Sequence, residues 1–167
     1  MKTSVRAAVV LLTILGCVGC DQYTKSIARD YLPRETPISL LNDVVRLQRD
    51  ENPGAFMSVG DSLSTDARRV LFVFGGAVLV IGTAFWALGS RRRSSAHILG
   101  AALISGGGFS NLIDRVTQGG NVTDFLNIGV GPLRTGIFNC ADVALMLGLA
   151  ILICSDSIAT RLRSLLR

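Results

Sequence analysis

Charged residues are scarce in this protein. They make up 17% of its 167 residues, whereas a typical soluble domain has about 25%. Apolar residues account for 49% of the chain, and the mean hydropathy is +0.48. The net charge of +5 could by itself suggest a nucleic-acid partner, but the apolar excess points first to a membrane. The composition therefore argues against an ordinary soluble globule.

Histidine and cysteine are also rare. The single histidine, His97, excludes a multi-histidine zinc site and argues against a Ser/His/Asp triad. The four cysteines, Cys17, Cys20, Cys140 and Cys154, lie in or beside apolar runs, unlike those of a secreted disulfide framework. We interpret the C-x-x-C pair at 17–20 as small residues packed in a helix, with a lipid-attachment box or a redox motif as alternatives. We expect no metal and no other cofactor.

Long apolar runs, in contrast, are abundant. A helix that crosses about 30 Å of hydrocarbon needs about 20 apolar residues. Four segments approach this length, at residues 7–22, 70–90, 94–113 and 136–155. Glycines and other small residues inside them suit close helix packing in lipid. The sequence therefore predicts a mainly α membrane protein, a single domain over residues 1–167 with four transmembrane helices.

The charges between these segments predict an orientation. The two termini and the loop with arginines at 91–93 carry eight cations and one acid. The connections 21–69 and 114–134 carry nearly equal numbers of cations and acids. By the positive-inside rule, both termini and the arginine loop are cytoplasmic, and the two connections face outward. The arginines are then a membrane anchor, and we expect no nucleic-acid partner.

The first outward connection has a pattern of its own. Residues 38–41 and 44–49 are β-leaning runs around Asn42 and Asp43, which predicts a small hairpin on the outer membrane surface. Residues 50–54 are typical of a turn. We therefore expect a small extracytoplasmic β-cradle.

Two further elements are expected outside the membrane. Ser64 can cap a short outer helix through residues 66–69 that leads into the second span. In the other outward connection, Gly119 and Gly120 precede an alternating run at 122–126. This run predicts another short strand.

Acidic residues near the membrane are the most informative. An ionised Asp in a transmembrane helix costs at least about 2.5–3.5 kcal/mol on insertion scales. Asp142 falls in the first third of the fourth span, and with Gly136 at the outer end it would lie about 9 Å deep at helical rise. Asp124 lies in the connection that returns to this span, so both can reach one level. Two such carboxylates would share a proton, one acting as base toward water and one as acid, which is aspartic peptidase chemistry.

These polar residues also have other interpretations. Asp142 can be a structural hydrogen-bonding residue, or the relay of an ion- or proton-coupled membrane carrier. Asp114 and Arg115 can form a structural ion pair or anchor a helix end. Asp21 and Lys25, one helical turn apart, can likewise be a structural pair. A carrier would need acids staggered across the bilayer, whereas these cluster at its outer side.

Five sequence blocks match a known family in order. They are D-Q-Y-T-K at 21–25, N-P-G-A-F-M-S at 52–58, G-F-S-N-L-I-D-R at 108–115, V-T-D-F at 122–125 and F-N-C-A-D at 138–142. With them the whole chain resembles lipoprotein signal peptidase (signal peptidase II). This family of aspartic peptidases removes prolipoprotein signal peptides at the bacterial inner membrane.

The resemblance implies that Asp124 and Asp142 are the catalytic pair. It implies supporting or substrate-binding roles for residues of the other blocks, namely Asn52, Gly54, Asn111, Arg115, Asn139 and Ala141. It implies that Asp21 and Lys25 are structural polar residues near the site. The implied partners are membrane lipids and a signal-peptide helix followed by a diacylglyceryl cysteine, cut at the periplasmic face by what we expect to be a monomer. A catalytically silent, lipoprotein-binding relative is the further alternative.

Some positions depart from the family pattern. Residues 55–57 read Ala-Phe-Met where Ala-Ala-Phe is usual, which puts a larger side chain in the loop expected to act as a lid over the peptide. Ser110 stands where glycine is usual, and Val143 where serine is common. These departures leave the acids intact and bear on pocket shape and substrate preference.

Overall fold

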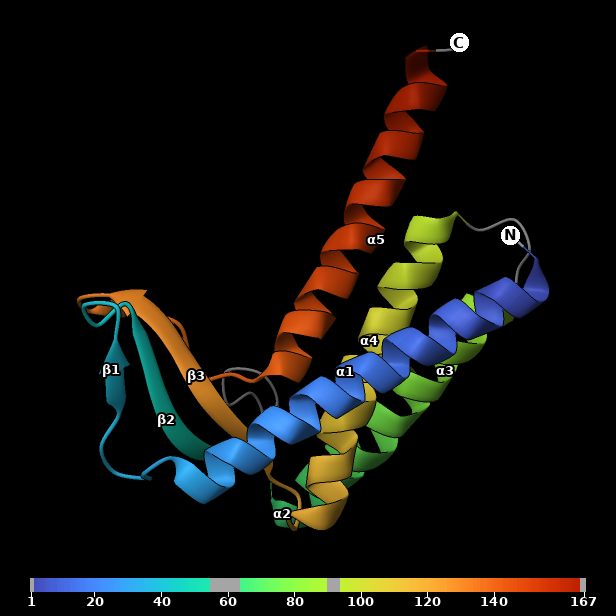
Figure 1. Ribbon diagram of the computed structural model, residues 1–167. Helices are drawn as coiled ribbons and strands as arrows, with labels where there is room; N and C mark the ends of the chain where they lie inside the picture. Colours follow the sequence, from blue (N-terminus) through green and yellow to red (C-terminus); the bar gives the residue numbers. More distant parts are fainter. Residues whose placement is uncertain (1, 55–63, 90–93, 166–167) are drawn as a thin grey trace.

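The computed structural model describes residues 2–54, 64–89 and 94–165. Four long helices dominate it: α1 (Thr3–Tyr31), α3 (Gly76–Gly89), α4 (Ser95–Thr117) and α5 (Cys140–Leu165). Helix α4 is central, because α1, α3 and α5 all pack against it. In Figure 1 the far end of α5 diverges from the other three helices, and the strands lie beside the C-terminal half of α1.

Among the described residues, three helical stretches are long and apolar enough to cross a membrane. They are Thr3–Tyr31, Asp66–Gly89 and Ser95–Thr117, and Cys140–Ser155 is a shorter apolar helix. The second stretch combines α2 (Thr65–Arg69), a π-helical segment η2 (Val70–Gly75) and α3. The chain is therefore mostly helical, as predicted, and its apolar helices fit a membrane-bound protein.

The first and third apolar helices extend beyond the predicted spans. Helix α1 continues to Tyr31 and α4 to Thr117. On α1, the buried residues Asp21, Lys25 and Ala28 recur at helical spacing, so one polar face of this extension is covered by the rest of the fold. The predicted ends followed the loss of apolar residues, whereas the helices end only where this packing ends.

The fourth apolar segment begins later than predicted. Residues 136–139 are not helical, and α5 starts at Cys140. Asp142 is therefore the third residue of the helix and lies in its first turn. The estimate of about 9 Å depth, which assumed a helix from Gly136 at about 1.5 Å per residue, was wrong.

Small residues let the helices approach closely. A Cβ added at Gly107 of α4 would overlap the backbone carbonyl oxygen of Ala141 on α5. At Gly148 of α5, an added Cβ would lie 2.6 Å from the carbonyl oxygen of Gly100 on α4. The two helices thus pack backbone against backbone, as small-residue interfaces in lipid allow.

The strands form one four-stranded antiparallel sheet in the order β1-β2-β3-β4. Their bounds are Ile38–Leu40, Val45–Asn52, Val122–Val130 and Leu133–Arg134. The predicted hairpin is confirmed as β1 and β2, and its turn has positive φ at Leu41, Asn42 and Asp43. The predicted strand at 122–126 is confirmed and extends to Val130.

The turn predicted at 50–54 was partly wrong. Asp50, Glu51 and Asn52 continue β2, where Asp50 pairs with Asp124 and Asn52 with Val122. A register shift between Leu47 and Asp50 allows this second stretch of pairing. Local turn propensity is overridden because β3 offers the backbone a partner. The predicted short helix with Ser64 as its cap is confirmed as α2, since the Ser64 hydroxyl accepts a hydrogen bond from the Ala67 amide at 3.3 Å.

Candidate active site

Asn139 caps helix α5 and fixes Asp142. The side-chain oxygen of Asn139 accepts a hydrogen bond from the Asp142 amide at 3.0 Å. In return, Oδ2 of Asp142 accepts one from the Asn139 amide at 3.2 Å. This reciprocal pair is a capping box, in which the third helical residue reaches back to the cap. The Asp142 carboxylate is therefore held at the N-terminus of α5.

Asp124 approaches the same cap from the sheet. It lies on β3, and its Oδ1 accepts a hydrogen bond from Nδ2 of Asn139 at 2.6 Å. Its Oδ2 accepts another from Nδ2 of Asn52, at the end of β2, at 3.0 Å. Both acids are nearly fully buried. The structure thus brings Asp124 and Asp142, from different elements, to hydrogen bonds with the same residue.

Asn111 on α4 supports the second acid. Its Nδ2 donates to Oδ1 of Asp142 at 3.0 Å. Its Oδ1 accepts from the Lys25 ammonium at 2.8 Å and from Nδ2 of Asn139 at 3.2 Å. Every oxygen of the two carboxylates therefore faces an N–H donor, which stabilises negative charge in a buried place.

A fully buried ion cluster lies behind these amides. The Lys25 ammonium is 2.7 Å from Oδ2 of Asp21 and 3.1 Å from Oδ2 of Asp114. The predicted pairing of Asp21 with Lys25 is confirmed. The predicted pairing of Asp114 with Arg115 was wrong: consecutive residues on a helix point in different directions, and Asp114 faces α1.

The carboxylates of this cluster also hold backbone. Oδ1 of Asp21 accepts from the Ala141 amide in the first turn of α5 at 2.8 Å. Oδ2 of Asp114 accepts from the Thr123 amide, next to Asp124, at 3.0 Å. The cluster therefore ties α1 and α4 to both segments that carry the paired acids.

Ser110 and Gln22 hydrogen-bond to the carboxylates of this cluster, a role that the sequence analysis did not assign to them. The Ser110 hydroxyl donates to Oδ2 of Asp21 at 2.7 Å. The Gln22 side chain donates to Oδ1 of Asp114 at 2.9 Å and to the Ser110 hydroxyl at 3.1 Å. The position of Gln22 in the D-Q-Y-T-K block could have identified it. Ser110 carries no such signal, because glycine is usual there.

Arg115 joins the sheet to the helices. Its guanidinium donates to the carbonyl oxygens of Gly54 at 2.6 Å and Gly120 at 3.0 Å. It also lies 5.0 Å from the ring centroid of Phe72, in cation–π range. Arg115 thus fixes the end of β2 next to Asn52.

Burial changes the acidity of Asp124. Loss of solvent is the largest cause that raises the pKa of this carboxyl, from 3.8 to about 7, and the nearby charge of Asp142 raises it further. The hydrogen bonds from Asn52 and Asn139 oppose this rise, because they stabilise the charged form. Near neutral pH, Asp124 can therefore hold or release a proton.

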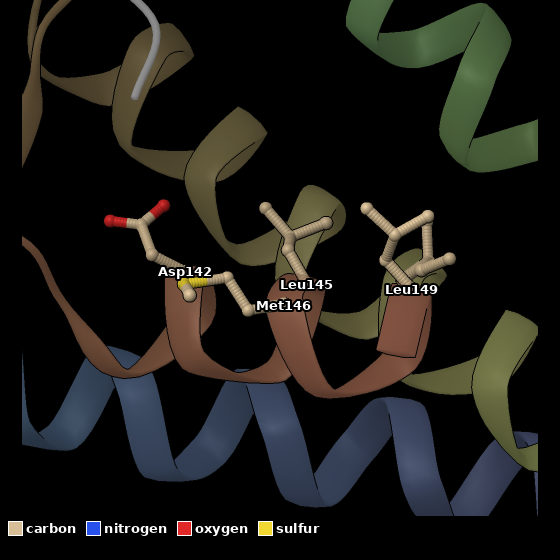
Figure 2. A pocket seen from close by; sticks show the side chains of 5 residues that line it. Asp142, Leu145, Met146 and Leu149 are labelled. Atoms are coloured by element: carbon tan, nitrogen blue, oxygen red, sulfur yellow. The ribbon is translucent and has the colours of Figure 1, made fainter. Parts of the chain in front are cut away.

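Apolar grooves border Asp142. One cavity of about 320 Å³ is lined by Asp142 together with Ile104, Leu145, Met146 and Leu149. Figure 2 shows the side chains of Asp142, Leu145 and Leu149 on one face of α5, turned away from α1. A second cavity of about 310 Å³, between α3, α4 and α5, also reaches Asp142. A carboxylate thus meets a long apolar surface.

Residues 13–158 match the family model described as signal peptidase (SPase) II. The chain belongs to this family. As a member of the signal peptidase II family, it is 35% identical over 156 residues to the lipoprotein signal peptidase of Leifsonia xyli, covering 90% of this chain and 68% of that protein. It is 32% identical over 141 residues to that of Chlorobium phaeobacteroides, covering 80% of each.

Solved structures share the fold of this signal peptidase II family member. A bacterial membrane enzyme determined by the in meso method at 2.3 Å resolution aligns with a TM-score of 0.80 at 22% identity, covering 92% of this chain and 90% of that one. A second, at 1.9 Å resolution, gives 0.77 at 23% identity, with 89% and 92% covered. The match extends over nearly the whole fold, sheet and helices together.

The structure gathers every candidate residue of the sequence analysis into this site. They are Asp21, Lys25, Asn52, Gly54, Asn111, Arg115, Asp124, Asn139, Ala141 and Asp142. The departure at 55–57, and the lid expected there, lie outside the described residues. Val143 is partly exposed on α5 and lines an apolar groove beside Cys140.

Proposed function

We propose that this protein is an aspartic endopeptidase that cleaves the signal peptide from diacylglyceryl-modified prolipoproteins. Membership of the signal peptidase II family supports the peptidase activity and the prolipoprotein substrate. The aspartic mechanism rests on one observation. Asp124 and Asp142 both bond to Asn139 in a buried site, with an amide donor on each carboxylate oxygen.

The pair would act on a water molecule held between the two acids. Asp124, whose pKa is raised to about 7, carries the proton in the resting site and Asp142 is ionised. Asp142 takes a proton from the water, whose oxygen attacks the peptide carbonyl carbon, while Asp124 protonates the carbonyl oxygen. The tetrahedral intermediate then breaks its C–N bond as the proton on Asp142 passes to the leaving amine. One hydroxyl of the intermediate returns its proton to Asp124, which leaves a carboxylic acid product and restores both acids to their resting states.

The surroundings suit a substrate that is itself in the membrane. The apolar groove along Asp142, Leu145 and Leu149 offers a surface for a signal-peptide helix or an acyl chain. The sheet, which lies beside the C-terminal half of α1 (Figure 1), would act as a cradle for the peptide. These features give the peptide bond a polar, buried position with apolar surface below it.

The topology we propose has four membrane spans in a single domain over residues 1–167. Both termini and the arginines at 91–93 are in the cytoplasm, because these segments hold most of the excess cations. The acids then face the periplasmic side of the inner membrane, in contact with lipids, and the protein works as a monomer. An ion-coupled carrier is not favoured, because the buried acids cluster at one end of the bundle.

Cleavage by the purified full chain in detergent micelles tests this function. The substrate is a precursor peptide with a diacylglyceryl cysteine, and the same peptide without the lipid is the comparison. We expect cleavage before the lipid-modified cysteine only, and no cleavage by Asp142→Asn. Asp30→Asn, which changes an exposed carboxylate on α1, should cleave normally. Binding of the precursor without cleavage by the wild type would instead indicate a catalytically silent relative.

A further inference from the structure

Three of the four thiols line one groove between α1 and α5. Cys17 and Cys20 lie one helical turn apart on α1, and Cys140 is the first residue of α5. The groove has a volume of about 360 Å³ and is distinct from the one beside Asp142. All four cysteines have free thiols in this structure. Neither the cleavage chemistry nor the ion cluster uses them.

Contacts on both sides bring Cys20 and Cys140 together. The Thr24 hydroxyl lies 2.9 Å from the carbonyl oxygen of Cys20 and 3.5 Å from Sγ of Cys140. The next residues along each chain are also joined, since Oδ1 of Asp21 accepts from the Ala141 amide at 2.8 Å. The side chains of Cys20 and Cys140 line the same groove from its two sides. Two thiols on different helices thus lie at one groove, next to the buried hydrogen bond between Asp21 and Ala141.

We propose that Cys20 and Cys140 are a disulfide site that staples α1 to the start of α5. The inference rests on the proposed topology, which places this junction near the oxidising outer face of the membrane. Each thiol loses its proton and the pair gives up two electrons as the S–S bond forms. An external disulfide accepts both electrons and both protons and is released as two thiols.

The other two cysteines are set apart from this site. Cys154 lies about 21 Å further along α5 at 1.5 Å per residue, toward the cytoplasmic end in the proposed topology. Cys17 lies one turn before Cys20 on the same helix. A bond between Cys17 and Cys20 would close a short loop within α1 and would join no second helix. Cys17 is therefore the matched control for Cys140.

The disulfide would constrain the segment that carries Asn139, the N-cap residue of α5. Cys140 directly follows Asn139, whose side chain and amide hold both acids. A covalent bond at Cys140 fixes this segment on α1 in addition to the Asp21 hydrogen bond. The expected effect is greater resistance of the folded protein to heat, with the cleavage residues untouched.

The test uses the full chain purified in detergent and oxidised glutathione as the probe. After oxidation, free thiols are blocked with N-ethylmaleimide. The intact mass is measured by mass spectrometry, and the protein is then digested without reductant for peptide mapping. We expect two of the four thiols to escape alkylation and one cross-linked peptide pair that contains Cys20 and Cys140. The thermal midpoint should fall when the oxidised wild type is reduced, and this fall should be absent in Cys20→Ala and Cys140→Ala.

Control variants keep the result interpretable. Cys17→Ala and Cys154→Ala should still form the cross-link. Alkylation of all four thiols, glutathione adducts alone, or a Cys17–Cys20 bond would each overturn the proposal. Cleavage of the lipidated precursor is measured on the same samples, and Cys20→Ala should cleave it. A missing cross-link with normal cleavage refutes only the staple, whereas loss of cleavage in the wild type refutes the proposed function.

Discussion

The ammonium of Lys25 donates to Oδ1 of Asn111 at 2.8 Å, and this contact sets the direction of the Asn111 amide. With its oxygen occupied by the cation, Asn111 presents its N–H to Asp142. Lys25 touches neither paired acid, yet it orients the group that one of them bonds. A residue counted from the sequence as a structural partner of Asp21 is thus a positioning residue for the candidate site.

Removal of Lys25 should destabilise the protein strongly. Lys25→Met leaves the Asp21 carboxylate buried without its cation and leaves Asp114 with only the more distant Arg29 guanidinium at 3.9 Å. Breaking a buried pair in this way costs about 3–5 kcal/mol. The thermal midpoint in detergent measures the loss. The double variant Lys25→Met/Asp21→Asn should recover part of it, because one uncompensated charge is gone. If the double variant is less stable than Lys25→Met, charge burial is not the cause.

Close packing of α4 on α5 should be sensitive to a single methyl group. Gly107→Ala would push against the Ala141 carbonyl, one residue before Asp142. We expect a loss of about 1–3 kcal/mol in stability, as for other overpacked sites, together with reduced cleavage. Gly82→Ala is the matched control, since an added Cβ at Gly82 meets nothing within 4 Å. Equal effects of the two substitutions would argue against this interface as the cause.

The raised pKa of Asp124 makes a prediction about stability and pH. The pKa is 3.8 for an ordinary Asp and about 7 in the folded protein. Between about pH 4 and pH 7 the folded state therefore binds more protons, and stability falls as the pH rises. Asp124→Asn cannot ionise and escapes this loss. The free energy of unfolding of Asp124→Asn relative to wild type should thus be higher at about pH 8 than at about pH 4, by up to about 4 kcal/mol. The melting temperatures of the two proteins at both pH values measure this difference.

Asp43 provides a control of opposite sign. Hydrogen bonds from Arg46 and Ser39 hold the pKa of this carboxyl well below its usual range. Its ionised form therefore stabilises the hairpin turn above the unfolded pKa, and this stabilisation is lost as the pH falls through the folded pKa. The melting temperature of Asp43→Asn relative to wild type should decrease slightly from acid to neutral pH. The same trend for both variants would contradict the assignment.

For cleavage, the ability of the Arg115 guanidinium to donate two hydrogen bonds at once should matter more than its charge. Arg115→Lys keeps the cation but cannot bond the carbonyls of Gly54 and Gly120 together. Loss of one charge-assisted hydrogen bond of about 1.5 kcal/mol corresponds to roughly a tenfold fall in kcat/KM on the lipidated precursor. Arg46→Lys, which changes an arginine near the start of β2 that pairs with Asp43, should leave kcat/KM unchanged. An unaltered kcat/KM in Arg115→Lys would show that charge alone suffices.

The sequence predicted the elements better than their ends. Apolar length located the helices, and Asn42-Asp43 located the hairpin, because these signals are local. The extension of α1 to Tyr31 and the pairing of Asp50 with Asp124 depend on partners distant in the chain. The start of α5 was misplaced because apolar residues at 136–138 hid the cap at Asn139.

The site itself was accessible from the sequence through the five ordered blocks. The blocks identified the candidate residues, but not whether the two acids converge or how the residues bond. Asp114 was assigned to its neighbour Arg115, whereas the fold pairs it with Lys25 across two helices. The contact of Ser110 with Asp21 could not be foreseen, since it depends on the packing of α4 against α1.

The central claim is that Asp124 and Asp142 act as one unit, and comparison of three variants tests it most directly. Cleavage of the lipidated precursor is measured for Asp124→Asn, Asp142→Asn and the double variant, each shown to be folded by its thermal midpoint. Because a shared proton needs both carboxyls, each single substitution should reduce kcat by at least about 10²–10⁴-fold, and the double variant should lose little more than either. Cleavage near the wild-type rate by either folded single variant would contradict the account.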